Sequence, residues 1–327
     1  MAEFVVATTS PVPDWVAEAA ADVGVRFVTL SPLDADAVRV QLEDLRPHGY
    51  LLTWPGLGPF VDEALAEAAG DLRLVTYAGQ STEPAFCTAN LDVAALEERG
   101  ITLTTMPGAH LAVAEAAMGF LLAFELDLVQ RNAARKSDPA AVRLPARRRP
   151  GLVGSTLGIV GIGRIGRRVA ELAVACGMSV RYYSRTRKPE VERELGASFH
   201  ELPEPLAIGD SVSLHLPMGT AEGLIDAHVL SHASELTLIN TTSIATIVEP
   251  QALLAALDSG RVARFGLEGN YPPPFDEQLR HHGNDRVLLL PPYSSYDTPY
   301  GDRLGWQNYL ATLGAVVQGE DVPYRIR

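Results

Sequence analysis

The sequence predicts an α/β protein built from two domains with parallel sheets, and two observations lead to that class. Short apolar runs alternate with stretches of helical spacing along the 327 residues. This alternation is typical of parallel sheets covered by helices. Residues 155–188 also place a Gly-x-Gly-x-x-Gly spacing between an apolar run and a helix. The length is enough for one large or two medium domains.

The first hundred residues are predicted to form one α/β unit that ends near residue 105. A long helical pattern then runs from residue 109 to about 135, and its length and apolar character suggest a helix that connects two units. Residues 137–154 are rich in proline and arginine and are predicted to be a connection. Strands of the first unit are expected at 4–7, 27–30, 49–53, 72–76 and 101–104, with helices at 16–23 and 61–69.

The stretch 155–188 is predicted to fold as strand, tight turn, helix and strand. Leu157 begins a short apolar strand, and Gly161, Gly163 and Gly166 follow it. In a dinucleotide site the first glycine permits the turn, the second lets backbone approach the pyrophosphate, and the third lets the helix pack on the strand. The alternative is an ordinary glycine-rich turn, but the flanking strand and helix are the context that favours a dinucleotide.

The end of the second strand of this stretch bears on the choice of cofactor. A site for NAD normally has an acid there that binds the ribose hydroxyls. Here the chain has a serine and three cations, which suit a 2′-phosphate. We therefore expect NADP(H) in preference to NAD(H), the alternative being a solvated basic loop. The run is Ser184, Arg185, Thr186, Arg187 and Lys188.

The second unit continues the same alternation of strands and helices. Because ligands of such sheets lie beyond the carboxyl ends of the strands, the positions after each strand are the candidate site. Strands are expected at 157–160, 179–183, 210–217, 236–240, 263–267 and 287–290, with a helix at 251–257 and a last helix at about 302–317 that returns to the first unit.

Composition excludes several classes of function. The net charge of −13 argues against nucleic acid or an anionic membrane as a partner. With two cysteines, one of them on a predicted helix, and no signal-like N-terminus, we expect a cytoplasmic protein without a structural disulfide. No cluster of residues has metal-ligand spacing, so no metal is expected.

Several segments together resemble the D-isomer-specific 2-hydroxyacid dehydrogenases over nearly the whole chain. The basic run after residue 183 resembles the NADP-preferring glyoxylate and hydroxypyruvate reductase branch. The resemblance implies two Rossmann-like domains, one flavodoxin-like and one dinucleotide-binding, with a cleft between them. It implies a substrate domain of 1–105 plus 300–327, a cofactor domain of 106–299 that includes the long helix, and a homodimer. The segments are 90–92, 97–101, 106–108, 113–115, 156–166, 214–217, 238–241 and 260–263.

The resemblance fails at the three catalytic positions of the family. In the family an Arg binds the substrate carboxylate, and this chain has Ser243 at that position. A Glu orients the catalytic His, and its position corresponds to about Pro273. The position of the His itself corresponds to Tyr293. Glu268 stands at the family's Asp, and the loop after Gly79 is longer than usual. Loss of the Arg removes a bidentate carboxylate clamp, and loss of the His removes a general acid worth about 10²–10⁴-fold in rate.

The candidate site residues follow from these positions. Tyr293, Ser243 and Tyr271 are candidate catalytic residues, although tyrosines that merely fill the vacated space are the alternative. His110 is a further candidate acid, for which a packing role is favoured. Trp54, Gly79, Gln80 and Ser81 are expected to bind substrate. The expected cofactor-binding residues are Gly161, Gly163, Arg164, Ile165, Gly166, Ser184, Arg185, Thr186, Arg187, Leu216, Pro217, Thr241 and Glu268.

Three functions are compatible with an intact cofactor half beside an altered substrate half. We expect an NADP(H)-dependent oxidoreductase that acts on a small-molecule carbonyl other than a simple 2-keto acid. A catalytically inactive NADP(H)-binding sensor or partner subunit is the alternative. Non-redox chemistry with a retained cofactor ranks last, because only the loss of the usual proton donor suggests it.

Overall fold

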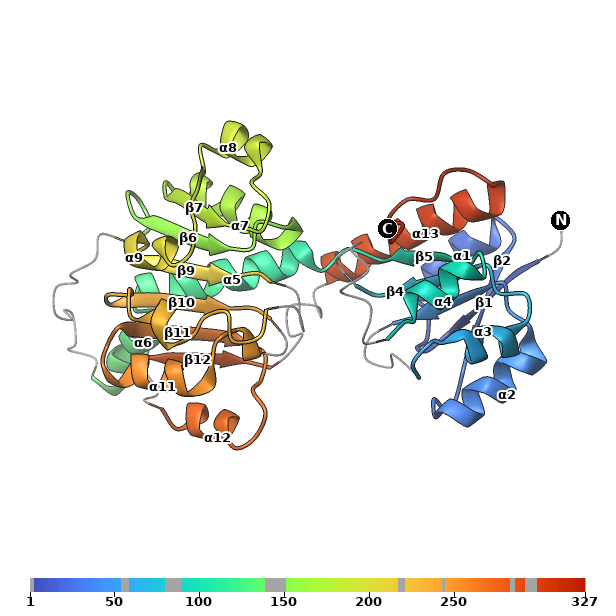
Figure 1. Cartoon of the computed structure of the whole chain (residues 1–327), viewed down its shortest axis with the longest axis horizontal. Coiled ribbons are helices and arrows are strands. Elements are labelled where there is room, and N and C mark those ends of the chain that lie inside the picture. Colours follow the sequence, from blue (N-terminus) through green and yellow to red (C-terminus); the bar gives the residue numbers. More distant parts are fainter. Residues whose placement is uncertain are drawn as a thin grey trace. The chain divides into compact units, whose positions relative to one another are not determined.

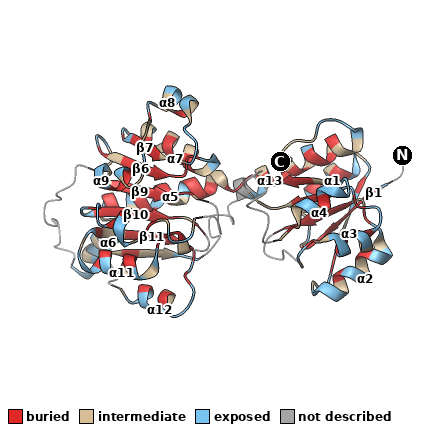
Figure 2. Ribbon diagram, in the orientation of Figure 1, coloured by how far each residue is buried: buried red, intermediate tan, exposed pale blue. Residues whose placement is uncertain are grey.

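The computed structural model describes residues 3–53, 59–79, 90–138, 151–216, 221–242, 245–282, 286–291 and 299–326, with backbone alone for 299–301. The chain divides into two compact units. One comprises Met1–Ala109 with Pro299–Arg327, and the other comprises His110–Thr298. Each unit has a sheet of buried strands with helices packed on it (Figures 1 and 2). In the described part of the chain, no helix combines the length and apolarity that crossing a membrane requires.

The first unit is a five-stranded sheet in which every neighbouring pair of strands is parallel. The strand order β2-β1-β3-β4-β5 is the flavodoxin-like one, which reverses direction between β1 and β3. Three of its helices begin at an aspartate, Asp34, Asp62 or Asp92, whose carboxylate accepts an N–H of the first turn. The strands are β1 Phe4–Thr8, β2 Val25–Thr29, β3 Gly49–Leu52, β4 Leu74–Tyr77 and β5 Thr102–Thr105.

Helices cover both faces of this sheet, since two separate apolar cores contain residues of its strands. On one face lie α2 (Ala35–Leu45), α3 (Glu63–Ala69) and α4 (Val93–Glu98). On the other lie α1 (Asp14–Ala21) and the last helix, α13 (Pro299–Gln318), so the C-terminal segment completes the unit that the N-terminus begins.

The second unit is a seven-stranded parallel sheet in the order β12-β11-β10-β9-β6-β7-β8. Apart from the added edge strand β12, this is the doubly wound order of dinucleotide-binding domains, with its reversal between β6 and β9. The strands are β6 Thr156–Val160, β7 Ser179–Tyr183, β8 Ser198–Phe199, β9 Ser211–Leu214, β10 Leu236–Asn240, β11 Val262–Glu268 and β12 Val287–Leu290.

The helices of the second unit also divide between two faces. One core joins the strands to α5 (His110–Glu125), α7 (Arg164–Ala175) and α8 (Pro189–Leu195). The other joins them to α9 (Glu204–Ile208), α10 (Ala227–Leu230), α11 (Pro250–Asp258) and α12 (Phe275–Arg280). Helix α5 therefore packs on the same face of the sheet as α7, the helix that follows the glycine motif.

The prediction of one continuous helix from residue 109 to 135 is wrong. The chain forms α5 and then α6 (Leu128–Ser137), and Asp127 between them has a positive φ of 47°. Arg264 of β11 holds the break, because it pairs with Asp127 at 3.1 Å and lies 4.0 Å from the buried Glu125. A tertiary ion pair thus overrides a helical pattern that local sequence would continue.

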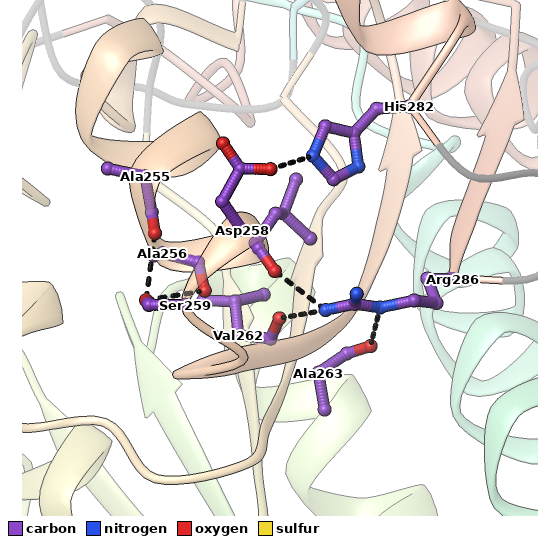
Figure 3. Close-up of polar contacts among 9 residues, drawn as sticks. Ala255, Ala256, Asp258, Ser259, Val262, Ala263, His282 and Arg286 are labelled. Carbon is purple, nitrogen blue, oxygen red and sulfur yellow. Dashed lines mark hydrogen bonds and ion pairs between the residues drawn. The ribbon is translucent and has the colours of Figure 1, made fainter.

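Arg286, the residue just before β12, joins this edge strand to neighbouring elements (Figure 3). Its guanidinium donates to the carbonyls of Leu257 at 2.7 Å, at the end of α11, and of Ala263 at 3.3 Å, in β11. His282 binds Asp258 at 3.0 Å beside it. These bonds tie the residue before β12 to the end of α11 and to β11.

Candidate dinucleotide site

The three motif glycines lie at the reversal point of the second sheet, where β6 meets β9. Gly161 has a φ of 97°, and a Cβ atom there would lie 2.6 Å from the carbonyl oxygen of His215. A Cβ atom on Gly166 would lie 2.0 Å from the carbonyl oxygen of Gly161. Gly163 is exposed and its missing Cβ faces open space. The first and third glycines therefore permit the turn and the packing of its helix, and the second leaves room for a ligand.

The helix that follows this turn presents its N-terminus at the same edge. Gly163 is the N-cap residue of the twelve-residue helix α7 and gives it no side-chain cap. Arg164, the first residue of α7, is exposed, and Ile165 packs against the core below. Backbone N–H groups and the positive end of the helix dipole make such an N-terminus suitable for the pyrophosphate of a dinucleotide. The geometry of the residues present fits that group.

A buried histidine stabilises the wall next to the glycine turn. His215 follows β9, and its Nε2 lies 2.8 Å from the hydroxyl of Ser213 while its Nδ1 lies 3.1 Å from that of Thr241. Burial lowers the pKa of His215 to about 3, so the ring is neutral at pH 7. His215 therefore joins the ends of β9 and β10, and it is not charged when a dinucleotide binds.

Asn240 organises the loop that holds one of the predicted catalytic positions. Its buried side chain ends β10, accepts the backbone N–H of Thr242 at 3.0 Å, and lies 3.5 Å from the carbonyl of Ala245. Ser243 itself lies outside the described residues. The amide of Asn240 nevertheless bonds to both ends of the loop that contains it. The sequence signal for this role of Asn240 was its place at the end of an apolar strand, because a buried amide must find hydrogen-bond partners nearby.

The turn after β7 uses two of its predicted phosphate donors within the chain. Arg187 binds both carboxylate oxygens of Glu192, at 2.8 and 2.7 Å. The hydroxyl of Ser184 donates to the carbonyl of Thr186 at 2.6 Å. Arg185 and Thr186 are exposed on the same turn. Arg187 is therefore already paired with a carboxylate. This corrects the prediction that all three cations of the run are available to a 2′-phosphate.

The remaining described candidates differ in how accessible they are. Glu268 is 2% exposed at the end of β11, and Leu216 is half-buried after β9. Tyr271 is 1% exposed and donates its hydroxyl to the carbonyl of Val248 at 3.3 Å. Its ring also packs edge-on against Phe275. The structure favours the packing alternative for Tyr271, since a substrate does not reach its hydroxyl in this arrangement.

His110 begins α5 at the same edge as the glycine turn. The opposite end of α5 lies near the amino ends of the strands, because Glu125 contacts Thr237 of β10 and Arg264 of β11. Burial, and then the charges of Arg164 and Arg168, lower the pKa of His110. The ring is therefore neutral near pH 7, which argues against a protonated acid at this position.

Several predicted residues lie outside the described part of the chain. They are Trp54, Gln80, Ser81, Pro217, Ser243 and Tyr293. Of the predicted substrate-binding residues, Gly79 alone is described. A Cβ atom there would lie 2.5 Å from the ring of Tyr77, so the close approach of that ring requires glycine. Among the described residues, no group of three or more His, Cys, Asp or Glu side chains could hold a metal ion.

The doubly wound sheet, the glycine turn and the helix N-terminus together define a dinucleotide-binding Rossmann domain. Residues 118–293 match the NAD-binding domain model of the D-isomer specific 2-hydroxyacid dehydrogenases. A glyoxylate reductase of Thermococcus litoralis is 34% identical over 273 residues, which is 80% of this chain and 79% of that protein. The chain belongs to the D-isomer specific 2-hydroxyacid dehydrogenase family. The family places it among the oxidoreductases that act on CH–OH and C=O groups with a nicotinamide dinucleotide.

Solved structures show the same fold over almost the whole chain. The D-mandelate dehydrogenase of Rhodotorula graminis in its apo form superposes with a TM-score of 0.82 at 22% identity, covering 99% of this chain and 97% of that one. An acyclic imino acid reductase, Bsp5, in complex with NADPH and D-Arg superposes with a TM-score of 0.77 at 20% identity, covering 99% and 100%. Both likenesses concern the fold.

Proposed function

We propose that this protein is an NADP(H)-dependent oxidoreductase that reduces a carbonyl-type substrate other than a simple 2-keto acid. The observation that carries the proposal is a contrast within one domain. The glycine turn has the geometry that a dinucleotide needs. The resemblance to the family, by contrast, assigns the positions of its Arg, Glu and His to Ser243, to about Pro273 and to Tyr293. The related glyoxylate reductases support the reaction class, and the missing carboxylate clamp argues against their substrate.

In this proposal NADPH supplies the hydride that reduces the carbonyl carbon. Tyr293 stands at the position of the family's catalytic histidine and gives its hydroxyl proton to the carbonyl oxygen as the alkoxide develops. Ser243 hydrogen-bonds the same oxygen in place of a guanidinium. Thr241 and Glu268 line the cofactor side of the site. Gly79 and the residues after it, Gln80 and Ser81, bind the substrate together with Trp54. Tyr271 we assign to the core.

The preference for NADP(H) rests on the turn after β7. The turn lacks the acid that would repel a 2′-phosphate. Arg185 and Arg187 are both exposed on it, and both also interact within the chain. Arg185→Met should weaken NADPH binding about tenfold and leave NADH binding nearly unchanged, because only NADPH carries the phosphate. Arg26→Met, which removes an arginine on β2 of the other unit, is the matched control. Equal losses for both dinucleotides would contradict the preference.

Turnover is the direct test of the proposed reaction. NADPH and NADH oxidation would be followed with glyoxylate, hydroxypyruvate and pyruvate beside uncharged aldehydes, ketones and imines. We expect oxidation of NADPH with one of the uncharged classes and little with the 2-keto acids. Tyr293→Phe should then lower kcat about 10²-fold or more, while Tyr324→Phe, which removes a hydroxyl that bonds to Asn308 within the first unit, should not. Rapid turnover of the 2-keto acids would show that other residues replace the Arg and the His.

The alternative of an inactive NADP(H)-binding subunit is favoured by the same missing residues. It predicts tight NADPH binding in titrations and no hydride transfer to any member of the panel. Hydride transfer to a single member at an enzyme-like rate would exclude it. The two proposals therefore differ in one measurement once binding has been shown.

We also propose a homodimer formed through the second unit. Leu122 of α5 is 37% exposed, and Leu126, Leu128 and Val129 next to it are exposed as well. Helix α6 has no buried residue, and its two large apolar side chains, Leu128 and Val129, are both exposed. Apolar surface of this kind is typical of an interface. Light scattering should give a mass twice that of the chain, and Leu128→Glu should shift it toward the monomer.

A further inference from the structure

We propose that Glu192 and Tyr182 are positioning residues that set the preference for NADPH over NADH by holding the turn after β7 in shape. The inference deepens the proposed function and rests on it. It assigns different tasks to residues that the sequence presents as one basic run. Arg185 faces the 2′-phosphate, whereas Arg187 anchors the turn.

The first observation is that Arg187 is engaged in a bidentate pair. Its Nε and one terminal nitrogen donate to the two oxygens of Glu192 at 2.8 and 2.7 Å. Paired N–H groups on one carboxylate fix the plane of the guanidinium as well as its position. The hydrogen bonds of Arg187 and Tyr182 lower the pKa of Glu192 to about 2, so the carboxylate stays charged at neutral pH. The charge of Arg187 is therefore largely balanced before any phosphate arrives.

The second observation is that the strand itself holds the far end of the turn. Tyr182 lies fully buried in β7, and its hydroxyl donates to Glu192 at 2.8 Å. The same hydroxyl accepts the backbone N–H of Lys188 at 2.7 Å. One tyrosine oxygen thus links the strand, the last residue of the turn and the helix α8. The ring cannot swing away, because it packs edge-on against Phe199.

The third observation is at the near end of the turn. The hydroxyl of Ser184 donates to the carbonyl of Thr186 at 2.6 Å and closes the backbone over two residues. Both ends of the segment 184–188 are therefore fixed by side chains, and Arg185 lies between them on the exposed side. A cation on a rigid turn loses less conformational entropy when it binds a phosphate than one on a mobile loop.

The inference predicts a loss of discrimination when the anchor is weakened. The adenosine of NADH needs no phosphate contact, so loosening the turn affects NADPH selectively. Glu192→Gln keeps the size of the side chain but removes the charge that organises Arg187. It should weaken NADPH binding about fivefold, with NADH binding changed less than about twofold. Tyr182→Phe keeps the ring packing and removes the shared hydroxyl, and it should act in the same direction.

The experiment measures dissociation constants for NADPH and NADH by the fluorescence of the bound nicotinamide, in the full-length protein. The variants are wild type, Glu192→Gln, Tyr182→Phe and the control Glu194→Gln. Glu194 lies two residues further along α8 and pairs with Arg167 of α7 at 2.5 Å, away from the turn. The control should leave the ratio of the two constants unchanged. Hydrogen exchange of the Lys188 amide is a second measurement, and it should quicken in Tyr182→Phe.

The outcomes separate this inference from the cofactor preference on which it rests. A wild type without preference for NADPH would overturn both. A wild type that prefers NADPH, with the same ratio in Glu192→Gln and Tyr182→Phe, would overturn the positioning role alone. Tighter NADPH binding in Glu192→Gln would also overturn it, because Arg187 would then bind the phosphate itself once the carboxylate released it. A lowered ratio together with faster exchange at Lys188 would support it.

Discussion

The two units of this protein have similar architecture, but different residues lie at the point where the strand order of each sheet reverses. In the second unit the reversal between β6 and β9 has a glycine turn, and Gly163 leaves open space there before α7 begins. In the first unit the reversal between β1 and β3 is closed by hydroxyls. Thr9 accepts the N–H of Thr53 at 2.9 Å and donates to its carbonyl at 3.3 Å. Topology provides a place for a ligand, and local residues decide whether it stays open.

The segments that follow the two central strands carry this difference further. After β1 the chain reads Thr-Ser-Pro-Val-Pro and contains no glycine before α1 begins. The hydroxyl of Thr8 donates to the carbonyl of Ser10 at 2.9 Å, so the polar groups bond to one another. After β6 the missing side chain of Gly163 leaves open space instead. The hydroxyls at the turn of the first unit therefore bond to the chain, whereas the turn of the second unit keeps open space at Gly163.

The largest expected effect comes from closing the open turn. In Gly166→Ala the added Cβ would lie 2.0 Å from the carbonyl oxygen of Gly161, so backbone must move. We expect a loss of about 3 kcal/mol in the free energy of unfolding of the second unit and loss of NADPH binding. Circular dichroism in urea measures the first, and a fluorescence titration the second. Unchanged binding would mean that the turn is not the site.

The three tryptophans allow the units to be followed separately. Trp15, Trp54 and Trp306 all belong to the first unit. Tryptophan fluorescence therefore reports the unfolding of that unit, while circular dichroism reports both. In Gly166→Ala the fluorescence transition should stay near that of the wild type if the two units unfold independently.

The next effect concerns the buried histidine and the pH. The pKa of His215 is about 3 in the folded protein, against 6.5 for an unperturbed histidine. Between these values the unfolded chain binds a proton that the folded chain does not, so stability rises with pH across this window and falls as pH drops from 6.5. The slope is roughly 1.4 kcal/mol per pH unit, or about 2 kcal/mol at pH 5.

His215→Asn tests this dependence, because asparagine forms hydrogen bonds but does not titrate. Its stability should vary less between pH 7.5 and 5 than that of the wild type, when urea unfolding is followed by circular dichroism. The comparison is between slopes, so a general loss of stability in the variant does not affect it. Parallel curves for the two proteins would show that the histidine is protonated in the folded state.

A smaller effect is expected at the closed reversal of the first unit. Thr9→Val keeps the shape of the side chain but leaves the N–H of Thr53 without its acceptor. The cost should be about 1–2 kcal/mol in the tryptophan-detected transition, because Thr9 is 4% exposed. NADPH binding should not change. A weaker affinity for NADPH in this variant would contradict the division of tasks between the two reversals.

The smallest structural effect belongs to the glycine that faces open space. Gly163→Ala meets no atom within 4 Å and has a φ of −73° that alanine readily adopts. Its stability should lie within about 0.5 kcal/mol of the wild type. Because backbone approach to the pyrophosphate needs that space, NADPH binding should weaken by about tenfold. The variant thus separates binding from folding, which Gly166→Ala does not.

The sequence by itself determined the class of fold and predicted a turn for the cofactor, because both depend on local patterns. Apolar runs separated by helical spacing specify parallel strands, and the glycine spacing marks one turn among many. The resemblance to the family also led to the prediction, still untested, that its Arg, Glu and His are replaced at Ser243, at about Pro273 and at Tyr293. That prediction rests on residue identity at positions that the resemblance to the family assigns.

Only the tertiary structure decided which polar groups are already engaged. The break at Asp127 depends on Arg264, 137 residues away, and the role of Arg187 depends on Glu192 and Tyr182. Tyr271 looks like a catalytic candidate in the sequence, but its hydroxyl bonds to the carbonyl of Val248 in the core. A hydrogen bond joins atoms by distance in space, and hydrophobic spacing along the chain says nothing of which side chain will come within 3 Å. The hydrophobic pattern of the sequence specified the fold, and tertiary packing decided which polar side chains bond to one another.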